Sequence, residues 1–475
     1  MNIKNIVEFI NSGDINAKER TEEDSLKYLI FNGRLREVIL DKILREFEDP
    51  QTIKELTSRI VPINIMKKTI SKLAQVYKND PIRRPADLLP ADEELIINYE
   101  RSLNINQIMQ YANKLFKLHK HVVVEPFLDR DGIPRLRAVP SQSFWIFSDD
   151  AMNPERMTTY VKLIKDGEEE ERRYSMWTDE EHWIVDGKGA IDRQAMIEMG
   201  NEEGKNRFGR IPAIHINESI DLLYPIRPTD ILSVQFAICL LLSDTTLAQK
   251  YLSWGTLLIS GGDGDENIKV GAGAVLNLPA LQDGSKPDAK YIQPELKSDE
   301  VLKLVDKLVE YLLATNNLSA GTIIGKAQVS TASGISKMLD EVQSTEDKEE
   351  QRKYFESGER DLWDLFAHYM LPVWTASGEI NQEYKGAFSN GFEINIIFKD
   401  MKPMLTEKEQ VELVIVKLNA GLITQRDAIK ELNPSLTDEQ VEEKISDIAE
   451  ERTVMLGDSS DDTEEEDNEE ADDKD

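Results

Sequence analysis

The sequence predicts a mixed α+β, helix-rich protein made of several regions, and three patterns along the chain indicate this. Apolar residues recur at helical spacing in the first hundred residues, and residues 121–185 alternate with a period of two between turn signals. The central part then combines apolar helices with one long polar helix. At 475 residues the chain is long enough for two to four domains and a large buried core.

The helical pattern of the N-terminal region is clearest after Asn64. This residue can cap a helix, because apolar residues recur behind it at spacings of three and four. They are Met66, Ile70, Leu73 and Tyr77. We expect this helix to stop at Asn79-Asp80-Pro81, since proline disfavours a helical conformation in the residue before it. Another helix is predicted over residues 94–118.

A run of β-strands is predicted next. Residues 121–124 and 136–139 flank Asp129-Arg130-Asp131-Gly132, which is a hairpin signal. Period-two segments separated by turn signals continue the pattern, at residues 143–147, 158–164, 172–177, 182–185 and 212–217. The sequence therefore predicts an antiparallel meander of about a hundred residues.

Two helices are predicted around a Gly-, Asp- and Pro-rich segment at residues 255–294. Residues 231–242 (ILSVQFAICLLL) are apolar on nearly every side of a helix, so this helix must be covered all round. The cover could be the core of one large domain, or neighbouring copies of the chain on both flanks. The second helix, at residues 296–313, is amphipathic. Its apolar stripe is Val301, Leu304, Val305, Leu308 and Leu312.

A long helix is predicted from Ser333-Gly334 to Leu371. Its two ends are apolar, whereas residues 343–353 (QSTEDKEEQRK) contain no apolar side chain. Such a polar middle is expected where a helix crosses solvent or a wet interface. The alternative is a pair of shorter helices with a break near Ser344.

The C-terminal part is predicted to hold a strand at residues 392–398 and then three short helices. Thr406 with Glu409, and Thr437 with Gln440, form capping boxes at helix starts. Gly421 and Asn433-Pro434 separate the helices. Residues 458–475 carry twelve acidic side chains, one lysine and no large apolar residue, and this tail is expected to be disordered.

The charge and the cysteine content limit the possible functions. The formal net charge is −32, of which the tail contributes −11, so the rest of the chain is acidic as well. This argues against a conventional nucleic-acid binder. Two explanations of the acidic charge are left open, solubility alone and repulsion of phosphate. Cys239, the single cysteine, is expected to be buried and inert. The longest apolar run, residues 236–242, is shorter than a membrane span, so a soluble intracellular protein is expected.

Signatures of catalysis and of cofactor binding are missing from the sequence. It contains no GxxxxGK[ST] phosphate loop, GxSxG elbow or HExxH helix. Asp263, Asp265 and Asn267 imitate a calcium loop whose later ligands are absent. His119 and His121 could ligate a metal, yet no matching ligand spacing accompanies them. We therefore predict no catalytic residues, no metal, no cofactor and no enzyme, and keep a metal-dependent nuclease built from scattered carboxylates as an alternative.

Four segments carry a resemblance to a known family. They are NDPIRRP at 79–85, PAIHINES at 212–219, ASGISKMLDE at 332–341 and TEKEQVELVIVKLNAGLITQRDAIKELNP at 406–434. In this order the chain resembles portal proteins, the head-to-tail connectors of tailed double-stranded-DNA bacteriophages. The resemblance covers nearly the whole length and implies the phage portal fold with wing, stem, clip and crown. His215 and His368 are read as lone core histidines outside these roles.

The resemblance divides the chain into regions. It implies a wing at 1–228, stem helices at 229–254 and 295–315, a clip at 255–294, a tunnel loop at 316–333, a long tunnel helix at 334–371, a wing return strand at 372–403, a helical crown at 404–455 and a disordered acidic tail at 456–475.

The resemblance also implies roles for single residues. Tunnel-loop residues that would face DNA are Ser319, Thr322, Lys326, Gln328, Ser330 and Thr331. Stem candidates for the channel are Lys303 and Lys307, although pairing with Asp299, Glu300 or Glu310 is an alternative for them. The clip docking surface would hold Asp263, Asp265, Asn267, Lys269, Asp283 and Lys286. Packing between stem helices of neighbouring subunits would use Ile231, Phe236, Leu240 and Leu241.

The resemblance implies a ring, with twelve copies in the virion, through which DNA is packaged and later ejected. Implied partners are the terminase large subunit, a head-completion or adaptor protein, the major capsid or scaffolding protein, and double-stranded DNA that passes without specific binding; no membrane is implied. The protein would be found at the capsid vertex, and in the host cytoplasm during assembly. An acidic assembly scaffold, suggested by the tail, is a further alternative.

Overall fold

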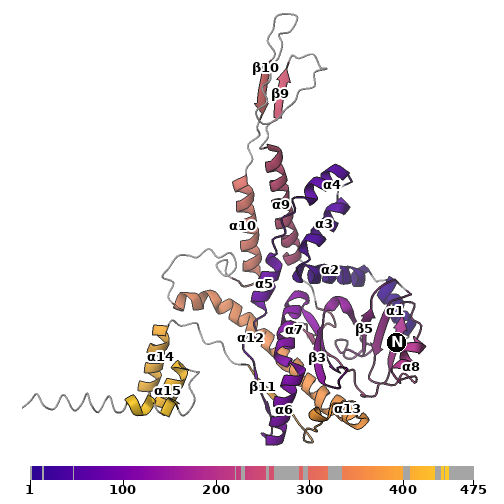
Figure 1. Cartoon of the computed structure of the whole chain (residues 1–475), viewed down its shortest axis with the longest axis vertical. Coiled ribbons are helices and arrows are strands. Elements are labelled where there is room, and N and C mark those ends of the chain that lie inside the picture. Colours follow the sequence, from indigo (N-terminus) through magenta and orange to yellow (C-terminus); the bar gives the residue numbers. More distant parts are fainter. Residues whose placement is uncertain are drawn as a thin grey trace, which may run out of the picture. The chain divides into compact units, whose positions relative to one another are not determined.

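The computed structural model describes residues 3–12, 15–46, 48–168, 170–219, 221–225, 230–252, 256–260, 288–292, 298–318, 334–398, 407–433, 440–442 and 444–448 (Figure 1). The chain divides into two compact units. One comprises residues 1–330 and 340–399, and the other comprises residues 331–339 and 400–475. Helices and strands both contribute to the first unit, which confirms the mixed α+β, helix-rich fold class.

Helices dominate the N-terminal region, as predicted. They are α1 (Ile3–Ser12), α2 (Ile15–Phe31), α3 (Leu35–Glu46), α4 (Pro50–Thr57) and α5 (Ile65–Leu73). The side chain of Asn64 accepts a hydrogen bond from the backbone N–H of Lys67 at 2.8 Å, which confirms the predicted cap. The predicted end was wrong, because Ala74 leaves the helical region of backbone conformation and α5 stops six residues early. Tyr77 therefore lies outside the helix, although it is buried.

The helix predicted over residues 94–118 is in fact two helices. They are α6 (Pro90–Leu103) and α7 (Ile105–His119). Asn104 separates them, with a left-handed backbone at φ 49°. Asparagine is one of the few residues besides glycine that tolerates this conformation, so it can end one helix and begin another without a longer loop.

The predicted meander is confirmed as antiparallel strands, but the strands divide between two sheets. One sheet has the order β3-β2-β8, from β2 (His121–Leu128), β3 (Pro134–Val139) and β8 (Ile214–Asn217). The other has the order β4-β5-β6-β7, from β4 (Phe144–Phe147), β5 (Thr159–Lys165), β6 (Arg173–Trp177) and β7 (His182–Asp186). Short helices η1 (Ser141–Ser143) and α8 (Arg193–Glu198) lie among these strands in the sequence.

Two apolar clusters fix the four-stranded sheet in place. On one side, Val123 and Val139 pack against Phe144, Ile146 and Tyr160, so this cluster joins the two sheets. A second cluster joins helix α1 to the four-stranded sheet and contains Ile6, Val7, Trp145, Val161, Tyr174, Met176 and Val185. The four-stranded sheet therefore packs against the three-stranded sheet in one cluster and against helix α1 in the other.

A two-stranded sheet joins distant parts of the first unit. Strand β1 (Ile82–Pro85) pairs antiparallel with β11 (Ile394–Ile397). The strand predicted at residues 392–398 is confirmed as β11, whereas β1 was not predicted. Its four residues, IRRP, show no apolar alternation and include a proline. The short helix η3 (Gln382–Tyr384) lies ahead of β11 in the sequence.

The long helix is confirmed as continuous. Helix α12 (Gly334–Asp364) leads into a π-helical turn, η2 (Leu365–Met370), and then into α13 (Leu371–Ser377). Pro372 explains the wider turn, because its ring has no N–H and clashes with the carbonyl four residues earlier in a regular helix. No break occurs at Ser344.

The polar middle of α12 does not cross solvent in its described part, which corrects the expectation. Lys117 on α7 binds Asp347 at 2.8 Å, and Asn113 on the same helix donates to Gln351 at 3.4 Å. Gln351 is buried. Asp347 and Gln351 therefore find partners on α7 of the same subunit, while Glu349, Glu350 and Lys353 are exposed.

The second unit contains α14 (Glu407–Asn419) and α15 (Gln425–Leu432), and residues 440–442 and 444–448 are helical as well. Gly421 has a positive φ of 72° between α14 and α15, as suits a predicted helix separator. A capping box forms at Thr424 and Asp427, which sequence reasoning missed. The predicted boxes begin at Thr406 and Thr437, which lie outside the described residues.

Candidate functional site

The two helices predicted to form a pair lie side by side in the first unit (Figure 1). They are α9 (Asp230–Leu252) and α10 (Ser298–Thr315). A buried apolar cluster joins them through Ile238 on α9 with Val309 and Leu313 on α10. The predicted stripe of α10 was partly wrong, because Leu304 is 49% exposed while Val309 and Leu313 are buried.

The connection between α9 and α10 contains a hairpin that sequence reasoning missed. Strands β9 (Thr256–Ser260) and β10 (Asp288–Ile292) pair antiparallel. The clip docking residues between these strands lie outside the described residues: Asp263, Asp265, Asn267, Lys269, Asp283 and Lys286. The tunnel-loop candidates lie outside them as well: Ser319, Thr322, Lys326, Gln328, Ser330 and Thr331.

One side of α9 packs on the N-terminal helices of the same chain. Ile231 is 5% exposed and belongs to this core, so it has little surface left for a neighbouring subunit. Phe236 and Leu240 are only half-buried at the edge of the core, with the ammonium group of Lys42 4.9 Å from the centre of the Phe236 ring. Leu241 is half-buried and lies outside the apolar clusters of the described residues.

Polar side chains anchor the first half of α9. The buried amide of Gln235 accepts hydrogen bonds from the backbone N–H groups of Ile65 and Met66 and donates one to the carbonyl of Ile63. Farther along the helix, Ser243 accepts from the N–H of Val61 at 3.1 Å. These bonds fix α9 against the start of α5.

The thiol of Cys239 faces the same contact and is buried, as predicted. Burial raises the pKa of Cys239, which disfavours the reactive thiolate.

Helix α9 is strongly apolar, although only some of its residues are fully buried within the described structure. Over Asp230–Gln249 it is long and apolar enough to cross a membrane by length and composition. A core helix of a soluble protein passes the same test, so a single such helix assigns no membrane. Only 33% of its most apolar window is buried in the described structure. Several of its large apolar residues, among them Phe236, Leu240 and Leu241, are only half-buried, so part of their surface is left uncovered by the described part of the subunit.

One face of α10 mixes exposed apolar and cationic groups. Leu304 and the 67% exposed Tyr311 are seven residues apart, and Lys307 lies between them at helical spacings of three and four. The ammonium group of Lys307 binds Glu310 at 2.6 Å, which confirms the pairing alternative for this lysine. Lys303 lies one turn earlier and is exposed.

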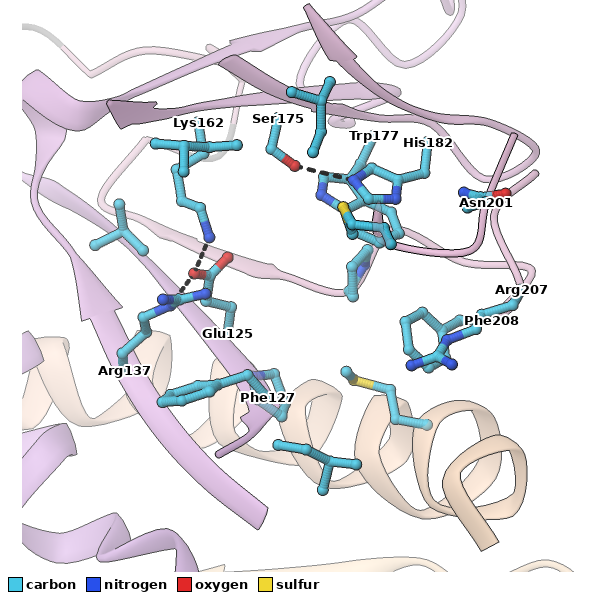
Figure 2. Close-up of a pocket in the computed structure, with 18 of the residues that line it drawn as sticks. Glu125, Phe127, Arg137, Lys162, Ser175, Trp177, His182, Asn201, Arg207 and Phe208 are labelled. Carbon is cyan, nitrogen blue, oxygen red and sulfur yellow. Dashed lines mark hydrogen bonds and ion pairs between the residues drawn. The ribbon is translucent and has the colours of Figure 1, made fainter. Parts of the chain in front are cut away.

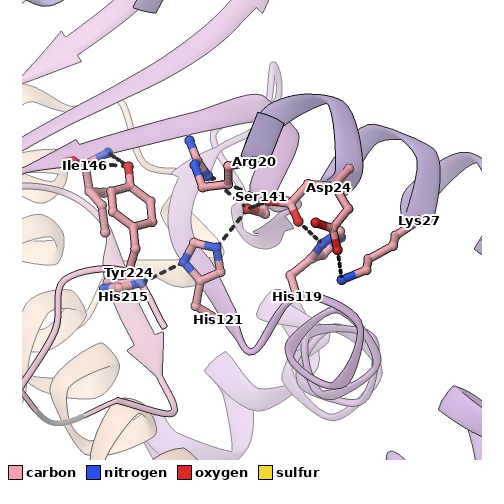
Figure 3. Close-up of polar contacts among 10 residues, drawn as sticks. Arg20, Asp24, Lys27, His119, His121, Ser141, Ile146, His215 and Tyr224 are labelled. Carbon is pink, nitrogen blue, oxygen red and sulfur yellow. Dashed lines mark hydrogen bonds and ion pairs between the residues drawn. The ribbon is translucent and has the colours of Figure 1, made fainter. Parts of the chain in front are cut away.

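A buried polar network occupies the junction of α2, α7 and the sheets (Figure 3). Asp24 contacts His119 at 3.1 Å and accepts from Ser141 at 2.5 Å. Ser141 in turn contacts His121 at 2.8 Å, and His121 contacts His215 at 3.1 Å. His215 is therefore not the lone histidine that the sequence suggested.

Burial sets the protonation of this network. It lowers the pKa of His215 to about 3 and, with His215 as a neighbour, lowers the pKa of His121 well below its usual value. Burial opposes ionisation of Asp24, but hydrogen bonds from His119 and Ser141 outweigh it and lower the pKa of Asp24. His119 and His121 thus bind protein groups, and among the described residues no cluster of three or more potential metal ligands occurs.

A buried ion pair connects the NDPIRRP segment to the long helix. Arg83 on β1 pairs with Glu359 on α12, and both side chains are fully buried. Tyr77 donates to the same carboxylate at 2.6 Å, and Arg83 also contacts Glu100 and Asn106. The Glu359 carboxylate raises the pKa of Arg83 further, against the effect of burial. Sequence reasoning noted the motif but not its partner, because the two residues are 276 positions apart.

The sequence matches one protein family, and this match agrees with the order of the elements described above. Residues 14–454 match the family described as "Phage portal protein, SPP1 Gp6-like". The chain belongs to this family. It is thus a portal-vertex protein of a phage-like particle, from a family that is structural rather than enzymatic, with the mixed α+β portal fold. Helices α9 and α10 lie within residues 229–254 and 295–315, the ranges for which the sequence resemblance implies a stem.

Solved structures provide a weaker comparison for the portal chain. It is similar to a chain in "Neck of empty GTA particle computed with C6 symmetry" and to one in "Virion of native gene transfer agent (GTA) particle". Both are 12% identical with a TM-score of 0.38, and the alignments cover 81% of this chain and 94% and 93% of those chains. A chain in "Neck of native GTA particle computed with C12 symmetry" has a TM-score of 0.36, with 12% identity and coverage of 82% and 94%. No curated protein sequence matches the chain.

Proposed function

We propose that copies of this portal chain stand side by side in a closed ring, twelve in the virion, and that double-stranded DNA passes through the central channel. One observation carries the proposal: α9 is apolar on nearly every side, while only 33% of the residues in its most apolar window are fully buried in the described structure and large apolar side chains among the rest are half-buried. Neighbouring copies would cover the half-buried Phe236, Leu240 and Leu241. Family membership supports the same arrangement.

The remaining regions take their roles from this ring. Lys307 would lie at the subunit interface or the channel wall, with its charge partly balanced by Glu310, and Lys303 would lie on the same side. The tunnel loop at 316–333 would form the narrowest ring around DNA, and the long helix at 334–371 would support it. The acidic balance of −32 suits a channel through which DNA slides, because strong phosphate binding would add friction.

The ring would also dock the other proteins of packaging and tail attachment. The clip at 255–294, whose base is the β9–β10 hairpin, would bind the terminase large subunit and later a head-completion or adaptor protein. The wing would contact the major capsid or scaffolding protein. The crown at 404–455 would face the capsid interior. Assembly would take place in the host cytoplasm before the ring becomes part of the virion.

The ring is tested by placing a charge on the uncovered side of α9. Leu241→Glu should prevent ring assembly, because burying an unpaired carboxylate between subunits is costly. Ile197→Glu, on the exposed surface of α8, is the matched control and should leave assembly unchanged. Mass photometry and negative-stain electron microscopy report the particle size, and circular dichroism checks the fold. Normal rings formed by the L241E variant would contradict the proposal.

A further inference from the structure

A hollow of about 1110 Å³ lies between the two β-sheets of the first unit (Figure 2). Strands β2 and β3 form one wall, and β5, β6 and β7 form the other. The segment after α8 and the helical turn around Met370 and Trp374 close it further. Its volume lies just above the range of about 300–1,000 Å³ that is usual for ligand pockets, and the ring proposed above makes no use of it.

The side chains of strand β2 explain why the two sheets are separated at the hollow. Its alternate residues face the other sheet: Val123 packs in the apolar cluster, Glu125 comes next, and Phe127 lines the hollow. Glu125 is buried and binds Arg137 and Lys162, the latter at 2.6 Å. Figure 2 shows the Glu125 carboxylate between Arg137 and Lys162, and all three residues line the hollow.

The inner surface of the hollow is rich in aromatic rings. Phe127, Trp177, Phe208 and Trp374 line it. His182 stacks on Trp177 with 3.4 Å between ring centres and an angle of 7° between the planes. Ile164 also lines the hollow and is exposed. Such a surface favours large apolar side chains of a ligand.

The charge of the lining is opposite to that of the whole protein. It contains five cations, Arg130, Arg137, Lys162, Lys205 and Arg207, against the three acids Glu125, Asp129 and Glu379. This gives a local balance of +2 in a chain of net charge −32. Arg130 and Lys205 are exposed, and neither makes an ion pair with another described residue. The hollow therefore attracts acidic groups.

An edge strand, β3, contributes to the wall of the hollow. Strand β3 is at the edge of its sheet and pairs only with β2 within the described structure. Arg137, Ala138 and Val139 are consecutive in β3, and all three line the hollow. The hollow therefore reaches a strand that has one edge without a strand partner in the described structure. Such an edge can pair with an added strand.

We propose that this hollow binds an extended acidic segment of a partner protein, which adds as a strand to the free edge of β3. Alternate large apolar side chains of the segment lie on the half-buried rings of Phe127 and Trp177. Its carboxylates face Arg130 and Lys205 at the rim. The site goes beyond the ring and channel and does not depend on them.

The test uses the full-length protein and a fluorescein-labelled octapeptide that alternates glutamate and phenylalanine. Fluorescence anisotropy should show saturable binding of this probe. Alternating lysine–phenylalanine and glutamate–serine octapeptides should bind at least about tenfold more weakly, because each lacks one of the two matched features. The same probe with methylated backbone nitrogens on one edge should lose binding to a similar extent, since it cannot donate hydrogen bonds to β3.

Two charge-reversal variants test whether the probe binds in the hollow. R130E/K205E should weaken its binding about tenfold or more, whereas K72E/K78E, with the same charge change on exposed lysines outside the hollow, should stay within about twofold. Thermal melting shows that both variants fold. Equal binding to R130E/K205E and the unchanged protein would overturn the site. Equal binding of the methylated probe, or its displacement by millimolar citrate alone, would overturn strand addition in favour of a small-anion pocket.

Discussion

Arg83 and Glu359 form an ion pair with both side chains fully buried, and this pair ties strand β1 to the long helix α12. The carboxylate also accepts from Tyr77, and the guanidinium group reaches Glu100. A charge buried this deeply is stable only while its partner is present. The pair therefore couples the NDPIRRP segment to the position of the helix that follows the predicted tunnel loop.

Removing the cation should destabilise the subunit strongly. Arg83→Met leaves Glu359 buried without its charged partner, at an expected cost of about 3 kcal/mol or more in the free energy of unfolding. Arg84→Met is the matched control, because Arg84 is the next residue of the same strand and is exposed. Urea denaturation compares the two. Equal effects of R83M and R84M would show that the pair contributes little.

A close contact between α12 and β8 gives a second prediction. A Cβ atom at Gly358 would lie 2.6 Å from Cγ1 of Ile216. Gly358→Ala should therefore destabilise the protein by about 1–3 kcal/mol, although alanine is the better helix former. The double variant G358A/I216A should show less than the sum of the two single losses, because the smaller side chain makes room. Stabilisation by G358A alone would contradict the close packing.

Stability should fall as the pH falls from 6.5 towards 4. Burial lowers the pKa of His215 to about 3 and that of His182 to about 4, and also lowers the pKa of His121. In this window the unfolded chain takes up protons that the folded chain does not, so unfolding is favoured by about 1.4 kcal/mol per pH unit for each such histidine. Chemical denaturation between pH 4.5 and 7 measures the slope. His182→Phe keeps a ring against Trp177 and should reduce the slope, whereas an unchanged slope would contradict the lowered pKa of His182.

The tunnel-loop assignment can be tested by deletion. Removing residues 319–331 should leave ring assembly intact, because the contacts of α9 and α10 that we describe do not involve them. Packaging of DNA, or its retention in the head, should be impaired. Nuclease-protected DNA per particle is the measurement, with electron microscopy of the purified protein as the control for assembly. A normal amount of protected DNA would show that this segment is not the tunnel loop.

Local patterns were enough to predict much of the fold. The cap at Asn64, the strands of the meander and the continuous helix from Gly334 each depend on residues close in sequence. Strand β1 was missed because its partner β11 is about 300 residues away and its own sequence, IRRP, has no strand pattern. The ends of α5 and α6 were also missed, because the chain leaves the helical conformation at Ala74 and at Asn104, where no glycine or proline marks the end.

The site was harder to predict than the fold. The apolar character of residues 231–242 indicated that a cover is needed, but not which residues the subunit itself would bury. Ile231 belongs to the subunit core, while Leu241 keeps uncovered surface. The polar middle of α12 suggested that the helix crosses solvent. Its partners, Lys117 and Asn113, could not be recognised from the sequence because they lie on a helix more than 200 residues earlier. The hollow between the sheets has no local sequence signal, since seven segments contribute to it.

The most direct measurement is an electron cryo-microscopy structure of the assembled protein viewed along its symmetry axis. Our account predicts a closed ring of identical subunits in which Phe236, Leu240 and Leu241 contact an adjacent copy around an open central hole. A monodisperse monomer, or a ring whose α9 helices face solvent on their apolar side, would contradict it.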